Sequence, residues 1–98
     1  MSKILSKVEF TIGNKEKHKV SIEKERSFLG ISIIINIDNK EERKERVSTF
    51  GKKRFDLEIG NKENHEMKVE VNIPLFPDFR QWRCEVYIDG KIKDIYHL

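Results

Sequence analysis

Two of the three histidines stand at matching places in the chain, and histidine is well suited to acid–base chemistry and to metal binding near neutral pH. His18 and His65 each follow the sequence Ile-Gly-Asn-Lys-Glu by two positions. A metal site needs three or four converging ligands, and only Cys84 and His97 remain to help. The spacing C-x-x-C or H-x-x-x-H does not occur. We therefore predict that both histidines are turn residues on a solvated surface and that the chain binds no metal.

The other residue types with reactive side chains also point away from catalysis. Cys84 alternates in step with Val86 and Ile88, which predicts a small core side chain and not a thiolate nucleophile. The carboxylates fall on alternating exposed positions, so the sequence marks no acid–base pair among them. The glycines form neither of the phosphate-binding patterns G-x-G-x-x-G and G-x-x-x-x-G-K-S/T. We predict a protein that is not an enzyme, with no catalytic residues and no cofactor.

The sequence around these residues occurs nearly twice. Residues 8–23, VEFTIGNKEKHKVSIE, return at 55–70 as FDLEIGNKENHEMKVE, and Ile-Asp-Asn-Lys at 37–40 returns as Ile-Asp-Gly-Lys at 88–91. The repeated parts are turn sequences flanked by alternating apolar and polar residues, as in β-hairpins. We therefore predict an internal hairpin duplication, with pseudo-repeats at 8–40 and 55–91.

Alternation of apolar and polar residues extends over most of the chain and is typical of a sheet with one solvated face. It predicts strands at 8–12, 20–23, 31–38, 55–59, 67–73 and 82–88, with 31–38, the most apolar, in a central place. Short strands are expected at 47–50 and 92–96, and 39–46 is interpreted as a long polar hairpin tip. The prediction is one all-β domain over 1–98, an antiparallel β-sandwich or flattened barrel of seven to eight strands.

The composition of the chain indicates its cellular compartment and the classes of partner it could bind. The chain has 98 residues, a formal net charge of +3 and a single cysteine, which suits a reducing compartment, and no long apolar run is visible. We expect a cytoplasmic protein. Basic residues gather near the turns, but acidic residues are interleaved with them, and phosphate binding favours an unopposed basic stripe. Nucleic acid is therefore disfavoured as a partner. Contact with an anionic membrane is supported only by the same weak net positive charge.

One segment interrupts the alternation. Residues 74–82 hold both prolines of the chain together with Phe76, Phe79 and Trp82. Proline is excluded from a central strand, so the segment is expected to be a loop or corner. Its aromatic residues either fold back over an open end of the core or form an exposed patch that receives a partner. On the second interpretation the predicted partner-binding residues are Leu75, Phe76, Phe79, Arg80 and Trp82.

Several of the turn sequences resemble those of a known family. The run Ile37–Glu45, followed by Gly51-Lys52 and Phe55, is similar to the V-D-G-K-x-x…G-K-x-x-F stretch of the Fas apoptotic inhibitory molecule family. Glu85–Lys91 resembles the later strand and turn of that family. The resemblance spans most of this chain and about one half of a family member, which has two such all-β units. It implies an antiparallel β-sandwich without catalytic activity that works through protein contacts in the cytoplasm.

These observations together predict a non-enzymatic protein-interaction or accessory β-module, a monomer or a dimer paired through edge strands. Its expected partner is another protein. Two alternatives stay open at this point. One is a small ligand-carrying β-barrel with the aromatic residues of 74–82 at its mouth. The other is a basic peripheral adaptor on an anionic membrane surface or on nucleic acid.

Overall fold

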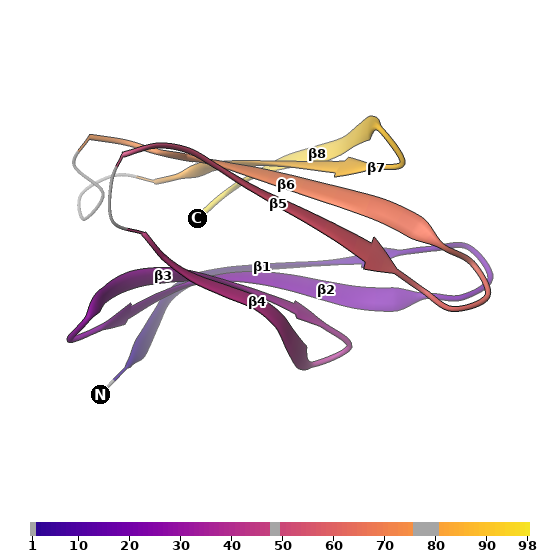
Figure 1. Ribbon diagram of the computed structural model, residues 1–98, viewed down its shortest axis with the longest axis horizontal. Helices are drawn as coiled ribbons and strands as arrows, with labels where there is room; N and C mark the ends of the chain where they lie inside the picture. Colours follow the sequence, from indigo (N-terminus) through magenta and orange to yellow (C-terminus); the bar gives the residue numbers. More distant parts are fainter. Residues whose placement is uncertain (1, 48–49, 76–80) are drawn as a thin grey trace. The chain divides into compact units, whose positions relative to one another are not determined.

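A computed structural model describes residues 2–47, 50–75 and 81–98, and over this part of the chain it contains eight β-strands and no helix (Figure 1). All the pairings between strands are antiparallel, in two four-stranded sheets. The predicted all-β, antiparallel fold is thereby confirmed. The strands are β1 (Lys3–Ile12), β2 (His18–Ser27), β3 (Gly30–Ile37), β4 (Lys40–Val47), β5 (Gly51–Ile59), β6 (His65–Ile73), β7 (Arg83–Ile88) and β8 (Lys91–His97).

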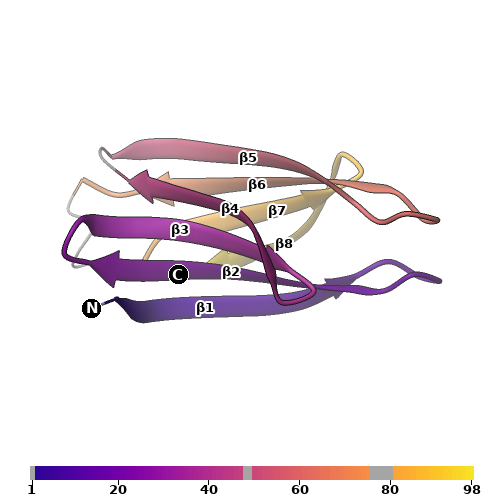
Figure 2. The same cartoon turned by 60° about the horizontal axis from the view of Figure 1, so that its bottom comes forward.

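The chain divides into two compact units, each built around one sheet. Unit 1 comprises residues 1–48 with Leu98, and unit 2 comprises residues 49–97. In unit 1 the strands lie side by side in the order β1-β2-β3-β4 (Figure 2). In unit 2 the order is β5-β6-β7-β8. In each unit, strands adjacent in sequence are also adjacent in the sheet.

The turns of the two units correspond closely. In unit 1, β1 and β2 are joined by residues 13–17, which begin with a glycine at a φ of 98°, and in unit 2, β5 and β6 are joined by residues 60–64, which begin with a glycine at 104°. The β3–β4 turn, Asp38-Asn39, and the β7–β8 turn, Asp89-Gly90, have positive φ at both central residues. That is the type I′ geometry whose twist matches a two-residue hairpin. The predicted turn positions are confirmed.

The register irregularities correspond as well. The β3–β4 pairing shifts between Ile35 and Asn36, and the β7–β8 pairing shifts between Val86 and Tyr87. In both hairpins the shift follows two regular pairs next to the turn. A β-bulge adds a residue to one strand and increases its local twist, so both hairpins bend at the same distance from their turns.

The buried side chains follow the alternation seen in the sequence. In unit 2, β5 alternates between exposed and buried residues from Arg54 to Ile59, and β6 and β7 bury their apolar face. In unit 1, β3 is buried from Ile31 to Ile35 on both of its faces, and it lies between β2 and β4. The prediction that this strand is central is therefore confirmed. The fully buried side chains include Val20, Ile22, Ile33 and Ile35 of unit 1 and Met67, Val69, Val71, Trp82, Cys84 and Val86 of unit 2.

The interpretation of residues 39–46 as a hairpin tip was wrong. Residues 40–47 form strand β4, which had been interpreted as part of a polar hairpin tip. β4 is an edge strand whose residues are exposed on both faces up to Arg46, so apolar alternation is not needed there. Charged side chains are instead usual on edges, where they oppose pairing with other chains. Of the short strand expected at 47–50, Val47 is the last residue of β4, Phe50 precedes β5, and 48–49 lie outside the described residues.

Within the part of the chain that is described, no helix is long and apolar enough to cross a membrane.

Candidate functional site

The predicted partner-binding segment is described only at its two ends. Leu75 is 62% exposed, while Trp82 is fully buried. A buried indole is not available to a partner in this conformation, so Trp82 belongs with the core side chains and not with a contact surface. Phe76, Phe79 and Arg80 lie outside the described residues. Their participation in a contact surface stays a prediction.

Leu75 has an exposed apolar neighbour that the sequence did not single out. Gly51 of β5 pairs with Ile73 of β6, so Phe50, just before β5, and Leu75, just after β6, lie at the same end of this strand pair. Phe50 is 63% exposed. Large apolar side chains exposed together at one end of a sheet are a feature of contact surfaces. We call Phe50 and Leu75 the unit 2 apolar end.

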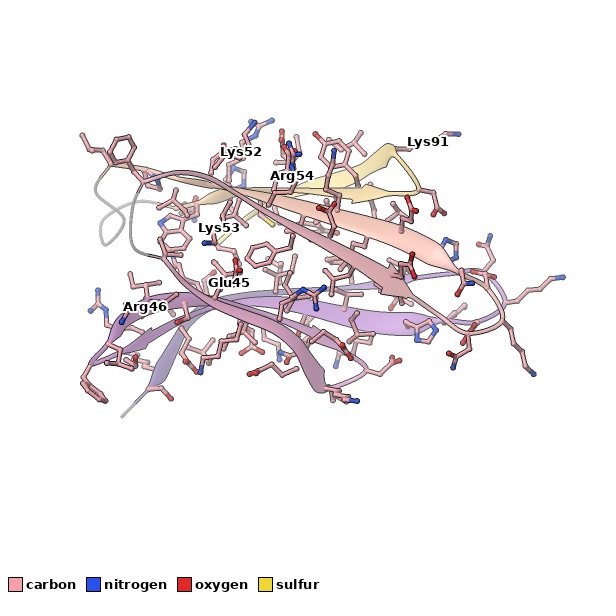
Figure 3. All side chains as sticks on the ribbon, viewed as in Figure 1. Glu45, Arg46, Lys52, Lys53, Arg54 and Lys91 are labelled. Carbon is pink, nitrogen blue, oxygen red and sulfur yellow. The ribbon has the colours of Figure 1, made fainter. Side chains whose placement is uncertain are left out.

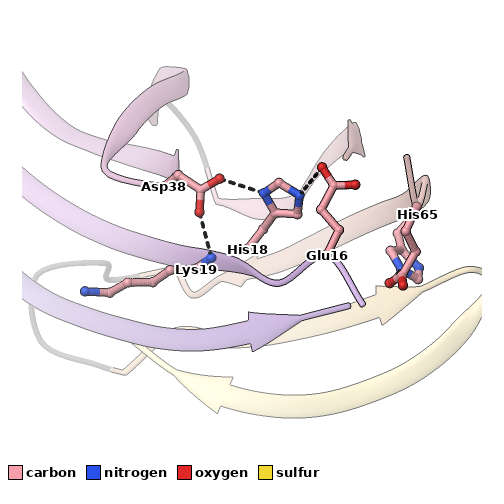
Figure 4. Close-up of polar contacts among 6 residues, drawn as sticks. Glu16, His18, Lys19, Asp38 and His65 are labelled. Carbon is pink, nitrogen blue, oxygen red and sulfur yellow. Dashed lines mark hydrogen bonds and ion pairs between the residues drawn. The ribbon is translucent and has the colours of Figure 1, made fainter. Parts of the chain in front are cut away.

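The most elaborate polar arrangement in unit 1 surrounds His18, the first residue of β2 (Figure 4). Its Nδ1 lies 2.6 Å from Oδ2 of Asp38, and its Nε2 lies 3.2 Å from Oε1 of Glu16. The second contact is an ion pair when the imidazole is protonated. Asp38 also accepts a hydrogen bond from the backbone N–H of Lys19 at 3.0 Å, and its own N–H donates to the Lys19 carbonyl at 2.8 Å. We call Glu16, His18 and Asp38 the first His–Asp–Glu cluster.

Unit 2 contains the same arrangement around His65, the first residue of β6. The Nδ1 of His65 lies 2.7 Å from Oδ2 of Asp89, and its Nε2 lies 2.5 Å from Oε2 of Glu63. Asp89 accepts from the N–H of Glu66 at 2.9 Å, and its N–H donates to the Glu66 carbonyl at 2.8 Å. Glu63, His65 and Asp89 form the second His–Asp–Glu cluster.

The first cluster joins the β1–β2 loop to the β3–β4 turn, and the second joins the β5–β6 loop to the β7–β8 turn. The aspartate lies one position beyond the last residue of β3 or β7, at a φ of 52°, a conformation that Asp and Asn tolerate better than most residues. The carboxylate of the aspartate accepts a hydrogen bond from the backbone N–H of Lys19 on β2 or Glu66 on β6, and its own N–H donates to the carbonyl of the same residue. These bonds extend the β2–β3 or β6–β7 pairing by one residue. The imidazole contacts both this aspartate and the glutamate of the preceding loop, and thereby links the loop to the turn.

The electrostatics of the clusters favour a charged imidazole. The pKa of His18 is raised above its usual 6.5, chiefly by the hydrogen bond with Asp38 and then by Glu16. The pKa of His65 is raised as well, with Glu63 as the largest cause and Asp89 second. The partners shift in the opposite sense: His18 lowers the pKa of Asp38, and the N–H of Glu66, followed by His65, lowers that of Asp89. Charge and hydrogen bonding therefore support each other within each cluster.

This geometry makes the histidines structural groups. Both ring nitrogens of each histidine lie within ion-pair distance of a carboxylate. The prediction that they are turn residues on a solvated surface was incomplete, because both side chains are mostly buried and hold their turns together. Among the described residues, no group of three or more His, Cys, Asp or Glu side chains is arranged to hold a metal ion.

Cys84 lies on the buried face of β7, as predicted. Burial raises the pKa of its thiol to about 12, and the nearby carboxylate of Glu85 acts in the same direction. A thiol in such surroundings stays protonated at neutral pH and is a poor nucleophile.

The face of the unit 2 sheet opposite to its apolar face carries a network of ion pairs around the buried Glu70. Lys52 and Arg54 project from the same face of β5, opposite to Lys53 (Figure 3). Their distances to the Glu70 carboxylate are 3.7 and 3.1 Å, and Lys68 approaches it at 3.8 Å. Nearby, Nζ of Lys68 lies 4.8 Å from the centre of the Tyr87 ring. Cations on this face are thus engaged by carboxylates and an aromatic ring, which leaves no unopposed basic stripe along these strands.

Both clusters could have been found in the sequence, since His18 and Asp38 recur as His65 and Asp89. What the sequence lacks is the pairing of β2 with β3 and of β6 with β7, which brings residues 20 and 24 positions apart into contact. The separation differs by four because the β6–β7 connection is seven residues longer than the β2–β3 turn, while β6 and β7 together are three residues shorter than β2 and β3.

No family model matches this chain, and neither the curated proteins nor the solved structures contain a significant match to it.

Proposed function

We propose that this chain is a non-enzymatic protein-interaction module whose contact surface is centred on the unit 2 apolar end. The observation behind the proposal is that Phe50 and Leu75 are more than half exposed and lie at the same end of the β5–β6 pair. Aromatic and aliphatic side chains of this kind are frequent anchors of protein interfaces. Phe76, Phe79 and Arg80, predicted from the sequence, would extend the surface along the chain.

A role in binding is also favoured because the side chains best suited to catalysis, the two histidines and Cys84, are paired or buried. The two histidines are engaged on both ring nitrogens, and the thiol of Cys84 is buried with a raised pKa. The same side chains therefore serve the stability of the turns and of the core. On the proposed function they have no substrate.

The proposal includes a view of how the module is built. The matching turns, bulges and His–Asp–Glu clusters support an origin of the two units by internal duplication. Each sheet has one apolar face, and such faces are ordinarily covered in a β-sandwich or flattened barrel, which is the architecture we propose. The resemblance to the Fas apoptotic inhibitory molecule family implies the same architecture, protein partners and a cytoplasmic location, and all three belong to this proposal.

The test is affinity purification of the tagged chain from its native cells, with the variant Phe50→Ser/Leu75→Ser beside the natural sequence. We expect the variant to lose at least one specific partner and to keep its melting temperature, because substitutions at exposed positions usually change stability by less than about 0.5 kcal/mol. Ile92→Ser is the matched control, since Ile92 is also an exposed apolar residue of unit 2, on β8. A second variant, Phe76→Ser/Phe79→Ser, extends the test to the adjoining segment.

Two outcomes would contradict the proposal. An unchanged set of partners in Phe50→Ser/Leu75→Ser would place the contact surface elsewhere. A marked fall in the melting temperature would mean that these side chains cover part of the core, which is the alternative interpretation of the segment.

A further inference from the structure

The β2–β3 turn of unit 1 ends in two exposed apolar residues. Ser27 pairs with Gly30, and Phe28 and Leu29 form the tip between them. Phe28 is 88% exposed and Leu29 is 61% exposed. The turn lies at the end of the sheet opposite to the first His–Asp–Glu cluster, because β2 begins at His18 and ends at Ser27 (Figure 1). We call Phe28 and Leu29 the unit 1 apolar tip.

The conformation of this turn does not require apolar residues. The left-handed backbone falls on Gly30, at a φ of 122°, and the hydroxyl of Ser27 accepts a hydrogen bond from the N–H of Leu29 at 3.2 Å. The turn is therefore stabilised by Ser27 and Gly30. The comparable turns Asp38-Asn39 and Asp89-Gly90 use polar residues and glycine, as two-residue hairpins usually do. The turn itself therefore does not need phenylalanine and leucine at its two tip positions.

The charges next to the tip are mainly positive. Within the three steps of the ladder that follow the turn, the charged residues are Arg26, Lys3, Arg46 and Glu25. The three cations are exposed, and Arg46 lies at this end of β4 (Figure 3). The single carboxylate, Glu25, is partly buried and forms an ion pair with Lys44 at 3.3 Å. Three of the four charged residues next to the tip are therefore cations.

More apolar surface adjoins the tip on β1. Ile4 pairs with Glu25, and the register of β1 against β2 shifts between Ile4 and Ser6, at Leu5. Ile4 and Leu5 are both exposed. A bulge on an edge strand opposes pairing with another strand, so this part of β1 is suited to side-chain contact more than to extension of the sheet.

We propose that the unit 1 apolar tip inserts into the interfacial layer of an anionic lipid bilayer while Lys3, Arg26 and Arg46 contact the headgroups. Exposed apolar side chains flanked by cations are the combination that binds such surfaces. The tip is a two-residue turn flanked by cations, so charge complementarity favours an anionic surface as its occupant. A bilayer requires no complementary pocket. This inference goes beyond the proposed function and does not depend on it, because it uses unit 1 alone.

The test is co-sedimentation of the full chain with vesicles of phosphatidylcholine alone and of phosphatidylcholine mixed with phosphatidylserine. We expect binding to the mixed vesicles only, and weaker binding as salt is raised. Phe28→Ser/Leu29→Ser should reduce the affinity by at least about tenfold for each apolar side chain lost. Ile92→Ser, an exposed apolar residue of unit 2, should bind like the natural chain. The melting temperatures of both variants serve as the control for folding.

A second measurement reports insertion directly. In Phe28→Trp the new indole should shift its emission to the blue and be quenched by brominated lipid, whereas the buried Trp82 should not respond. Equal binding to both kinds of vesicle, full binding by Phe28→Ser/Leu29→Ser, or an unshifted Phe28→Trp would overturn the inference. Self-association of the chain that Phe28→Ser/Leu29→Ser abolishes, without vesicle binding, would also overturn it in favour of a second copy as the occupant.

Discussion

Unit 1 and unit 2 agree at one end of their sheets and differ at the other. Both have a loop that opens with glycine, a His–Asp–Glu cluster, a type I′ turn and a bulge at the same distance from that turn. At the opposite end, β2 and β3 are joined by the unit 1 apolar tip, whereas β6 and β7 are joined by residues 74–82. The shared end is accounted for by hydrogen bonds and ion pairs within each unit. Apart from Ile92, next to the β7–β8 turn, the large exposed apolar residues of the described chain lie toward the ends that differ.

This contrast separates structural from binding residues without an alignment of related sequences. A feature that both units need for the same strands to pair is expected in both. A feature that is present in just one of the two units is not explained by this shared strand pairing. The side chains of the two His–Asp–Glu clusters have their partners within the same unit, whereas Phe28, Leu29, Phe50 and Leu75 at the differing ends are exposed. For this reason both of our proposals concern the differing ends.

The strongest test of the comparison removes core side chains from each unit in turn. Ile33→Ala in unit 1 and Met67→Ala in unit 2 each delete a fully buried side chain and should lower the free energy of unfolding by about 2–5 kcal/mol. If the chain is one domain, as predicted from its length, both variants shift the same cooperative transition in urea. Two separate transitions, of which each variant moves one, would contradict the single-domain prediction and the sandwich proposed above.

The next effect in size concerns the shared end. Asp38→Asn and Asp89→Asn keep an oxygen for the backbone N–H and tolerate the positive φ, but they remove the charge opposite the histidine. We expect the pKa of His18 or His65 in each variant to fall back toward 6.5, and the melting temperature to fall by a similar amount in both. NMR titration of the histidine ring protons measures the first, and thermal unfolding measures the second. A change in one unit only would mean that the clusters differ in function.

The smallest effect is the pH dependence of stability. Because the histidine pKa values are raised on folding, their stabilisation is present below 6.5 and is lost as the pH rises through the folded values. Because the aspartate pKa values are lowered, their stabilisation is present above 3.8 and is lost as the pH falls through the folded values. The clusters should therefore stabilise the chain most between about pH 4 and 6.5. His18→Gln/His65→Gln should flatten the upper limb of the melting curve against pH, and an unchanged limb would contradict this assignment.

Much of the fold could be predicted from the alternation of residues, and the exceptions have physical causes. β3 and β6 are rich in Ile and Val and lie between two other strands, so their patterns are strong. β4 has no apolar pattern because an exposed edge strand has no buried face to encode one. The unit 1 apolar tip was missed because a Phe-Leu pair between strands lacks the usual composition of a turn.

The candidate sites were less predictable than the fold. Leu75 was predicted and is exposed, but its neighbour Phe50 follows only from the pairing of Gly51 with Ile73. Trp82 was grouped with Leu75 because the two residues are close in sequence, and it is instead buried. Composition indicates that a segment is apolar. Whether a given side chain in it is covered depends on its neighbours in space.

By itself, the sequence determined that the chain forms strands and where most of its turns lie, since alternation and turn residues act over a few neighbouring positions. Only the tertiary structure decided which aspartate meets which histidine and which apolar residues stay in solvent. Those outcomes depend on strand pairing between residues some 20 positions apart. Register across a sheet is a property of several segments together, and no single segment encodes it.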